Sequence, residues 1–400
     1  MKEPIYITGM GIVSAIGLNQ SEVLSSLQNH QTGIAPMKYL KSEHTELPVG
    51  EVKLSDEEMK SMLSLASDKL FTRTSLMGII ALKEALHNAS IVPSETSRIG
   101  FVSGTTVGGM DQTERHYLEL FENNKFDSAI ENHDCGACTT TIADYFGGFS
   151  FVTSISTACS SAANAFILGS ELIESGELDI VVVGGSEALT KYHFNGFNTL
   201  MILDTEQCRP FDASRRGLNL GEGAAYLVLE SKASAARRKA KAIGILSGYG
   251  NACDAFHQTA SSADGEGAFR AMNQALEMAE LNKEEIQYIN AHGTGTPNND
   301  ASESAAMIRL FGEHLPPVSS TKSFTGHTTS ASGSIEAVIC LLAMQHQFLP
   351  INLNWKQPMP DGILPNMNDV PGGELQHVLC NSFGFGGNDS SLLLSKCIDQ

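Results

Sequence analysis

Three side chains in this sequence have the types and settings that nucleophilic catalysis uses. Cys159 follows an apolar run that predicts a buried strand, and it precedes small residues that predict the start of a helix. Unpaired N–H groups at a helix N-terminus lower the pKa of a nearby thiol, so we expect Cys159 to be reactive. His292 and His327 lie in glycine- and threonine-containing segments that predict loops. A neutral imidazole there could donate one hydrogen bond and accept another.

Each of these residues also has a purely structural interpretation. A lone cysteine is most often a buried, inert thiol. A loop histidine most often has its hydrogen bonds satisfied by its neighbours. Two histidines on loops that follow equivalent predicted strands favour the functional interpretation over the structural one.

A second group of residues could support these three. Lys322 and Glu303 are a possible supporting ion pair, although the segment Asp300–Glu303 equally fits a helix cap with its capping carboxylate. The glycine-rich segment Asn381–Asn388 could place a backbone N–H beside an oxyanion, because glycine permits unusual backbone dihedrals. Its structural interpretation is a turn between two strands.

Two other motifs do not indicate a cofactor site. The segment Gly9–Ser14 has serine where a dinucleotide-binding fingerprint has its third glycine. The pair Cys135 and Cys138 has no second cysteine pair at zinc spacing. We therefore predict neither a bound nucleotide nor a metal.

Short apolar runs alternate along the chain with segments of helical periodicity, and these elements must position the candidate residues. The alternation predicts α/β layers with buried sheets. The predicted strands are Ile5–Thr8, Ile99–Val102, Phe151–Ser156, Ile180–Val183, Tyr226–Leu229, Ile286–Asn290, Val318–Thr321 and His377–Leu379. The predicted helices are Leu76–His87, Ala162–Ile173, Ala268–Ala279 and Ile335–Gln345.

The chain also contains a weak internal repeat. A strand, a turn with a reactive residue, a small-residue helix and a second strand occur in the same order around Cys159 and again around His327. We predict two similar halves, 1–240 carrying the cysteine and 241–400 carrying both histidines and the glycine-rich loop. The basic stretch Lys232–Lys241 would join them.

Composition limits the class of protein. The 400 residues include 26 Lys and Arg and 45 Asp and Glu, which gives a formal charge of −19 and argues against nucleic-acid binding. No apolar run is long enough to span a membrane. The eight cysteines are unevenly spaced, which is not typical of a disulfide framework and favours a reducing, cytoplasmic location.

Four motifs that occur in order make the sequence similar to the β-ketoacyl-acyl-carrier-protein synthases, the elongating condensing enzymes of the thiolase superfamily. They are Ser156–Ser161, Asn290–Pro297, Thr321–His327 and Asn381–Gly387. Three shorter matches accompany them, at Thr8–Ser14, Arg209–Asp212 and Gly221–Ala224. The resemblance covers essentially the whole chain. Asn388 and Asp389 depart from it, because threonine and asparagine are usual there.

The resemblance implies a thiolase-like duplicated five-layered α/β/α/β/α fold and an acyltransferase. Cys159 would accept an acyl group, malonyl carrier protein would lose carbon dioxide, and the resulting enolate, stabilised by His292 and His327, would attack the acyl-cysteine. The synthase would need no cofactor of its own, because acyl carrier protein brings the phosphopantetheine arm. A homodimer, or a heterodimer with a related ketosynthase subunit, is the expected assembly.

The resemblance also implies roles for the remaining site residues. Lys322 with Glu303 would position the histidine loops. The backbone N–H groups of Cys159 and Phe383 would form an oxyanion hole, and the Phe383 ring would gate the cysteine. The expected substrate-binding residues are Thr294, Thr296, Gly384 and Phe385. Lys69 and Arg73, one helical turn apart, are the favoured docking site for an acidic carrier protein, and the basic run Arg237–Lys241 is the alternative.

Two other functions remain open at this point. A non-elongating partner subunit, like a chain-length factor, would pair with an active synthase, but such subunits typically lack the cysteine. A cysteine hydrolase would use the nucleophile with one histidine and deliver water. The second histidine argues against hydrolysis, since stabilising a thioester enolate benefits from two donors.

Overall fold

The computed structural model describes residues 3–66, 70–94, 98–123 and 128–397, and ten strands within them form one sheet. Their order across the sheet is β3-β2-β4-β5-β1-β6-β10-β9-β7-β8. The strands are β1 (Ile5–Ser14), β2 (Ile99–Gly104), β3 (Phe151–Ile155), β4 (Ile180–Glu187), β5 (Gly223–Ser231), β6 (Gly244–Cys253), β7 (Tyr288–Asn290), β8 (Val318–Ser319), β9 (His377–Gly384) and β10 (Asn388–Ser395).

The strand order is the same in the two halves of the chain. In the first half, β3, β2 and β4 are parallel and lead through antiparallel β5 to β1. In the second half, β8, β7 and β9 are parallel and lead through antiparallel β10 to β6. An antiparallel contact between β1 and β6 joins them. The duplication that the sequence predicts is therefore confirmed, whereas the boundary at residue 240 stays a prediction.

Twelve α-helices of the described residues surround the strands. They are α1 (Gln20–Gln28), α2 (Asp56–Met62), α3 (Arg73–Ala89), α4 (Met110–Asn123), α5 (Cys135–Phe146), α6 (Ser161–Glu174), α7 (Lys191–Thr199), α8 (Lys232–Arg238), α9 (Glu266–Ala279), α10 (Pro297–Phe311), α11 (Lys322–Thr325) and α12 (Ser332–His346). None of them is both long and apolar enough to cross a membrane.

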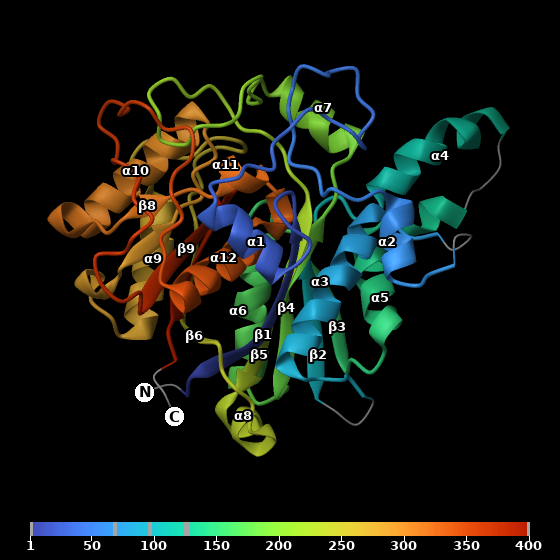
Figure 1. The fold of residues 1–400 in the computed structure, drawn as a ribbon, viewed down its shortest axis with the longest axis horizontal. Coiled ribbons are helices and arrows are strands. Elements are labelled where there is room, and N and C mark those ends of the chain that lie inside the picture. The colour runs from blue at the N-terminus through green and yellow to red at the C-terminus, as the bar shows by residue number, and fades with distance from the viewer. Residues whose placement is uncertain (1–2, 67–69, 95–97, 124–127, 398–400) are drawn as a thin grey trace.

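The strands of the first half of the chain and those of the second form two half-sheets. Together with the helices, these half-sheets make five layers, as the sequence resemblance implies. In Figure 1, α3 covers the outer side of the first half and α9 the outer side of the second, while α6 and α12 lie between the two half-sheets. Helix α12 is apolar on all sides and almost entirely buried, as a helix in a central layer must be. The two central helices follow β3 and β8, so their N-termini face the same region.

Arg73 does not lie on the surface, which contradicts its predicted role in carrier-protein docking. Its side chain is only 5% exposed, and its guanidinium contacts Glu222 at 2.6 Å and Asp56 at 2.8 Å. Lys69, the other member of that predicted pair, lies outside the described residues. The arginine joins α3, α2 and the segment before β5, so its role is structural.

We expect Arg73→Met to lower the free energy of unfolding by about 3–5 kcal/mol, because it leaves buried carboxylates without their cation. Denaturant unfolding of the purified protein measures this change. Arg237→Ala is the matched control, since the Arg237 side chain is 63% exposed and should change stability by no more than about 0.5 kcal/mol. Equal, small effects of both substitutions would contradict a structural role for Arg73.

Candidate active site

Cys159 lies in a tight turn between β3 and α6. The preceding residue, Ala158, has a φ of 52°, a left-handed conformation that costs a non-glycine residue about 1 kcal/mol or more. Ser161 stabilises the turn, because its hydroxyl oxygen accepts from the Thr157 N–H at 2.9 Å and its O–H donates to the Ala158 carbonyl at 2.6 Å. The turn thereby holds the thiol at the start of a central helix, where the sequence placed it.

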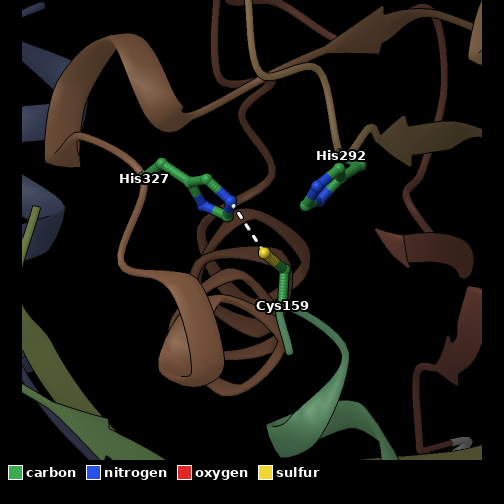
Figure 2. A group of neighbouring side chains, drawn as sticks. All are labelled: Cys159, His292 and His327. Carbon is green, nitrogen blue, oxygen red and sulfur yellow. Dashed lines mark hydrogen bonds between the residues drawn. The ribbon is translucent and has the colours of Figure 1, made fainter. Parts of the chain in front are cut away.

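His327 hydrogen-bonds to the nucleophile. Its Nε2 lies 3.1 Å from the Cys159 sulfur, and its Nδ1 lies 3.1 Å from the Ser332 hydroxyl. Two backbone hydrogen bonds, to the Asn219 carbonyl at 2.7 Å and from the Gly221 N–H at 2.9 Å, fix the loop on which it lies. Figure 2 shows this ring and that of His292 approaching the cysteine from different loops.

His292 completes the group from the loop after β7. Its ring centroid lies 5.2 Å from that of His327, with the rings nearly perpendicular. The Cys159 sulfur and one nitrogen of each ring lie within 4.8 Å of one another. This spacing would also suit a metal ion, so the absence of a metal stays a prediction. The prediction that Cys159, His292 and His327 share one site is confirmed geometrically.

Burial decides the protonation state of all three side chains. It lowers the pKa of both His292 and His327 well below the ordinary value, and the nearby Lys322 ammonium lowers both further. Both imidazoles are therefore neutral near pH 7, as predicted. Burial also raises the pKa of Cys159 to about 12, despite the opposing effects of Lys322 and of a hydrogen bond from the Phe385 N–H. The expectation of a lowered thiol pKa is wrong, because desolvation outweighs the helix terminus.

The raised thiol pKa predicts how alkylation of Cys159 depends on pH. Only the thiolate reacts, so the rate should rise roughly tenfold per unit between about pH 7 and pH 10 without levelling off. An ordinary cysteine levels off above its pKa of about 8.5. Mass spectrometry of the Cys159 peptide after timed iodoacetamide treatment measures the rate. Exposed Cys253 is the internal control, and a plateau for Cys159 near pH 8.5 would contradict the prediction.

Lys322 and Glu303 are both buried at the site, but they do not form the predicted pair. The Lys322 ammonium contacts Glu336 of α12 at 2.5 Å. Glu303 instead accepts the backbone N–H groups of His292 at 2.8 Å and Gly293 at 2.7 Å. Each carboxylate thus supports a different part of the site. Glu303 holds the His292 loop, and Glu336 pairs with the lysine that adds to the effect of burial on both imidazoles.

The alternative interpretation of Glu303 as part of a helix cap is also wrong. Helix α10 begins at Pro297 with Thr296 as its N-cap, so Glu303 lies inside the helix. Burial raises its pKa to about 7, against the effect of the two N–H groups that it accepts. Sequence reasoning missed Glu336 altogether. The available signal was a carboxylate within an otherwise apolar helix, which is costly unless it is paired.

The structure places Phe385, rather than Phe383, beside the Cys159 sulfur, and the gate and donor roles expected of Phe383 stay predictions. Phe383 lies within β9, is 6% exposed, and its ring packs 5.8 Å from that of His292. The N–H that hydrogen-bonds to the Cys159 sulfur is that of Phe385. The Phe385 ring is 37% exposed and stacks on Phe197 with ring centroids 5.8 Å apart. Phe385 is thus the ring at the entrance and the donor at the nucleophile.

A cavity of about 220 Å³ leads to the three central side chains. Thr294 and Thr296 line it with their hydroxyls 2.8 Å apart, and Gly384 and Phe385 line the opposite side. A Cβ at Gly384 would lie 2.9 Å from the Thr157 carbonyl, so only glycine allows the loop to approach the nucleophile turn this closely. The four predicted substrate-binding residues are therefore brought together around one cavity.

Comparison with known proteins agrees with this arrangement. The model of the β-ketoacyl synthase N-terminal domain matches residues 2–235, and that of the C-terminal domain matches residues 243–356. The chain belongs to the β-ketoacyl synthase family. The synthase is 32% identical to Nodulation protein E of Rhizobium meliloti (strain 1021), over 99% of its own length and all of that protein.

Other relatives of the synthase fit the same family. It is 32% identical to 3-oxoacyl-(acyl-carrier-protein) synthase 2 of Synechocystis sp., over 99% of its own length and 98% of that protein. The solved ishigamide ketosynthase/chain length factor is 30% identical with a TM-score of 0.92, and the similarity covers both chains completely. The synthase therefore has the thiolase-like fold and is a condensing acyltransferase of fatty-acid or polyketide chain elongation.

Proposed function

We propose that Cys159 carries the growing acyl chain. Its sulfur attacks the thioester carbonyl of an acyl group on the phosphopantetheine arm of acyl carrier protein, the carbonyl–sulfur bond to the arm breaks, and the thiol proton goes to the departing pantetheine sulfur. The backbone N–H groups of Cys159 and Phe385 would stabilise the oxyanion formed during attack. The contact between His327 and the Cys159 sulfur, inside a cavity that also contains His292, supports this assignment.

The second stage would use the two histidines. Malonyl carrier protein loses carbon dioxide, and the electron pair of the broken carbon–carbon bond forms an enolate whose oxygen accepts hydrogen bonds from His292 and His327. The enolate carbon then attacks the acyl-cysteine carbonyl, and the Cys159 sulfur leaves. Neutral imidazoles suit this role, because each can donate a hydrogen bond from Nε2. In His327 the Nδ1 lies 3.1 Å from the Ser332 hydroxyl, whereas the buried Nδ1 of His292 has no hydrogen-bond partner among the described residues.

The phosphopantetheine arm would enter along the cavity that Thr294 and Thr296 line. Both threonines line the cavity that contains Cys159, and hydroxyls can bond to the amide groups of an extended arm. No further cofactor is needed for the reaction as written. The acyl carrier protein that brings the arm is the proposed partner, in keeping with the carrier protein named for the Synechocystis relative.

The exposed edge of the sheet supports a dimer as the working form. Strand β3 pairs with β2 on one side only, and Val152 within it is 39% exposed. An open edge with an exposed apolar residue favours strand pairing with another chain. We propose a homodimer, and native mass spectrometry of the synthase tests it. The solved ketosynthase/chain length factor relative makes a heterodimer the other assembly to look for.

A non-elongating partner subunit is the second candidate function, and the assembled site argues against it. A subunit without catalysis has no need for a thiol, two neutral imidazoles and an N–H donor gathered at one cavity.

To test the proposed function, the synthase is offered a panel of acyl carrier proteins, and the acyl group on the Cys159 peptide is identified by mass spectrometry. A labelled Cys159 and a β-ketoacyl product after malonyl carrier protein is added support the proposal, and an unmodified Cys159 with every carrier would overturn it.

A further inference from the structure

A cluster of polar side chains connects the nucleophile turn to the Phe385 turn, and Asn388 lies at its centre. Asn388 is the first residue of β10 and one of the two positions that depart from the resembling motif. Its Oδ1 accepts from the Ser160 hydroxyl at 2.7 Å, from the Asn164 amide at 2.7 Å and from the Asn251 amide at 3.0 Å. One amide oxygen thus gathers three donors from different segments.

Two of those donors belong to the nucleophile turn. Ser160 directly follows Cys159, and its hydroxyl also lies 2.7 Å from the Thr157 carbonyl. Asn164, in the first turns of α6, donates to the Thr157 hydroxyl at 2.8 Å. The cluster therefore holds the backbone on both sides of the cysteine, and with it the direction of the Cys159 N–H.

The other end of the connection is the turn between β9 and β10. Phe385 lies three residues before Asn388, and the Gly387 N–H donates to the Gly384 carbonyl at 3.0 Å to close this turn. Because the turn is short, a fixed Asn388 also fixes the Phe385 N–H. The nucleophile turn belongs to the first half of the chain and the Phe385 turn to the second, so the Asn388 amide oxygen bridges the halves beside the reacting sulfur.

We propose that Asn388 is a positioning residue that sets the distance between the Cys159 and Phe385 N–H groups, the two donors for the oxyanion of acyl transfer. The proposal rests on the proposed roles of those two residues. Asn388 lines neither the cavity nor the sulfur contact, so it acts through Ser160 and Asn164 on one side and through the short turn to Phe385 on the other. Removing one oxyanion donor typically slows a reaction by about 10²–10³-fold, and a misplacement of about 1 Å has a similar effect.

The proposed role requires an acceptor oxygen in the side chain at position 388, because all three contacts use the Asn388 Oδ1 as an acceptor. Asn388→Asp keeps the shape and the acceptor oxygen and adds a partly exposed charge. Asn388→Leu has a similar size but no acceptor, so Ser160 and Asn164 keep their contacts to Thr157 but lose the bridge to the Phe385 turn. Comparing these two variants separates the hydrogen bonds from the packing of the side chain.

The two half-reactions provide the readout. We expect Asn388→Leu to lower kcat for acyl transfer from an acyl-pantetheine thioester to Cys159 by roughly 10- to 100-fold with little change in KM. Asn388→Asp should stay within about fivefold of the unaltered protein, since an exposed charge interacts weakly. Malonyl decarboxylation, measured as carbon dioxide release after Cys159 is alkylated, should change little in either variant, because the histidine donors do not depend on Asn388.

Two controls keep the test decisive. Asn273→Leu, on the outer helix α9, makes the same exchange away from the site and should leave both half-reactions unchanged. Thermal unfolding of every variant detects general damage. Equal loss of both half-reactions in Asn388→Leu, equal effects of the leucine and aspartate variants, or no effect of either would each overturn the proposal. Failure of the proposed function would appear differently, as an unaltered protein that does not acylate Cys159.

Discussion

Cys159→Ala is expected to lower the rate of condensation by roughly 10⁴-fold or more, because no other group at the site can carry the acyl chain. The assay measures β-ketoacyl product from acyl and malonyl carrier proteins. The fold should survive, since the side chain removed is small and the turn is held by Ser161 rather than by the thiol. Thermal unfolding of the variant should therefore lie close to that of the unaltered protein.

The control for this prediction is the exposed Cys253. Its replacement by alanine should leave condensation unchanged, and it removes a thiol that reagents reach more easily than the buried Cys159. In the Cys253→Ala protein, the alkylating reagent should abolish activity at the same rate at which it modifies the Cys159 peptide. Activity loss that follows a different cysteine would show that the nucleophile has been misassigned.

His292→Ala is expected to slow malonyl decarboxylation by about 10²–10³-fold, the usual effect of losing one donor to a developing oxyanion. Carbon dioxide release from malonyl carrier protein measures it. Acylation of Cys159 should survive far better, because the imidazole in contact with the Cys159 sulfur is that of His327. The decarboxylation rate of the unaltered protein should not fall as the pH is lowered through about 6.5, since burial keeps both imidazoles neutral there.

His327→Ala is the matched comparison, and it should behave differently. We expect a similar loss of decarboxylation together with a measurable loss of acylation, because the contact at 3.1 Å to the sulfur disappears. Comparing the two variants therefore shows which half-reaction each histidine serves. If His292→Ala impaired acylation as strongly as decarboxylation, the damage would be structural and the assignment of an enolate donor would be wrong.

The sequence predicted the central layers well, because their patterns are strong and local. Helices α6 and α12 combine small and apolar residues over several turns, although the segment predicted as a loop before His327 contains the short helix α11. The parallel strands β2 and β4 are continuous apolar runs, which are typical of sheets buried on both faces. Internal repetition then predicted how the halves correspond, even though no long-range contact is visible in a sequence.

Strand β6 was not predicted, and its glycines explain why. Gly248 and Gly250 lower strand propensity, yet the fold requires them. A Cβ at either position would lie within 2.2 Å of a backbone carbonyl of α9, at Ala275 and Ala271 respectively. The glycines allow α9 to approach the sheet closely. This requirement comes from packing between elements, which local patterns do not report.

The errors at the site have a similar origin. Glu303 and Glu336 lie on opposite sides of Lys322 in the sequence and neither is close to it, so only the fold shows that its ammonium meets Glu336 and not Glu303. Phe383 and Phe385 lie on the same side of an alternating strand pattern, so the sequence cannot say which N–H reaches the sulfur. The thiol pKa was misjudged because burial, which the sequence does not quantify, outweighs the helix terminus.

The central layer has a consequence for synthesis on the ribosome. Helix α6 packs against α12, which the ribosome makes much later, so the inner face of the first half stays uncovered while the second half is translated. At about 5–20 residues per second, this interval lasts roughly ten to thirty seconds. During it the nascent chain exposes an apolar surface and an unprotected Cys159. Chaperone demand during expression should therefore be highest before α12 emerges.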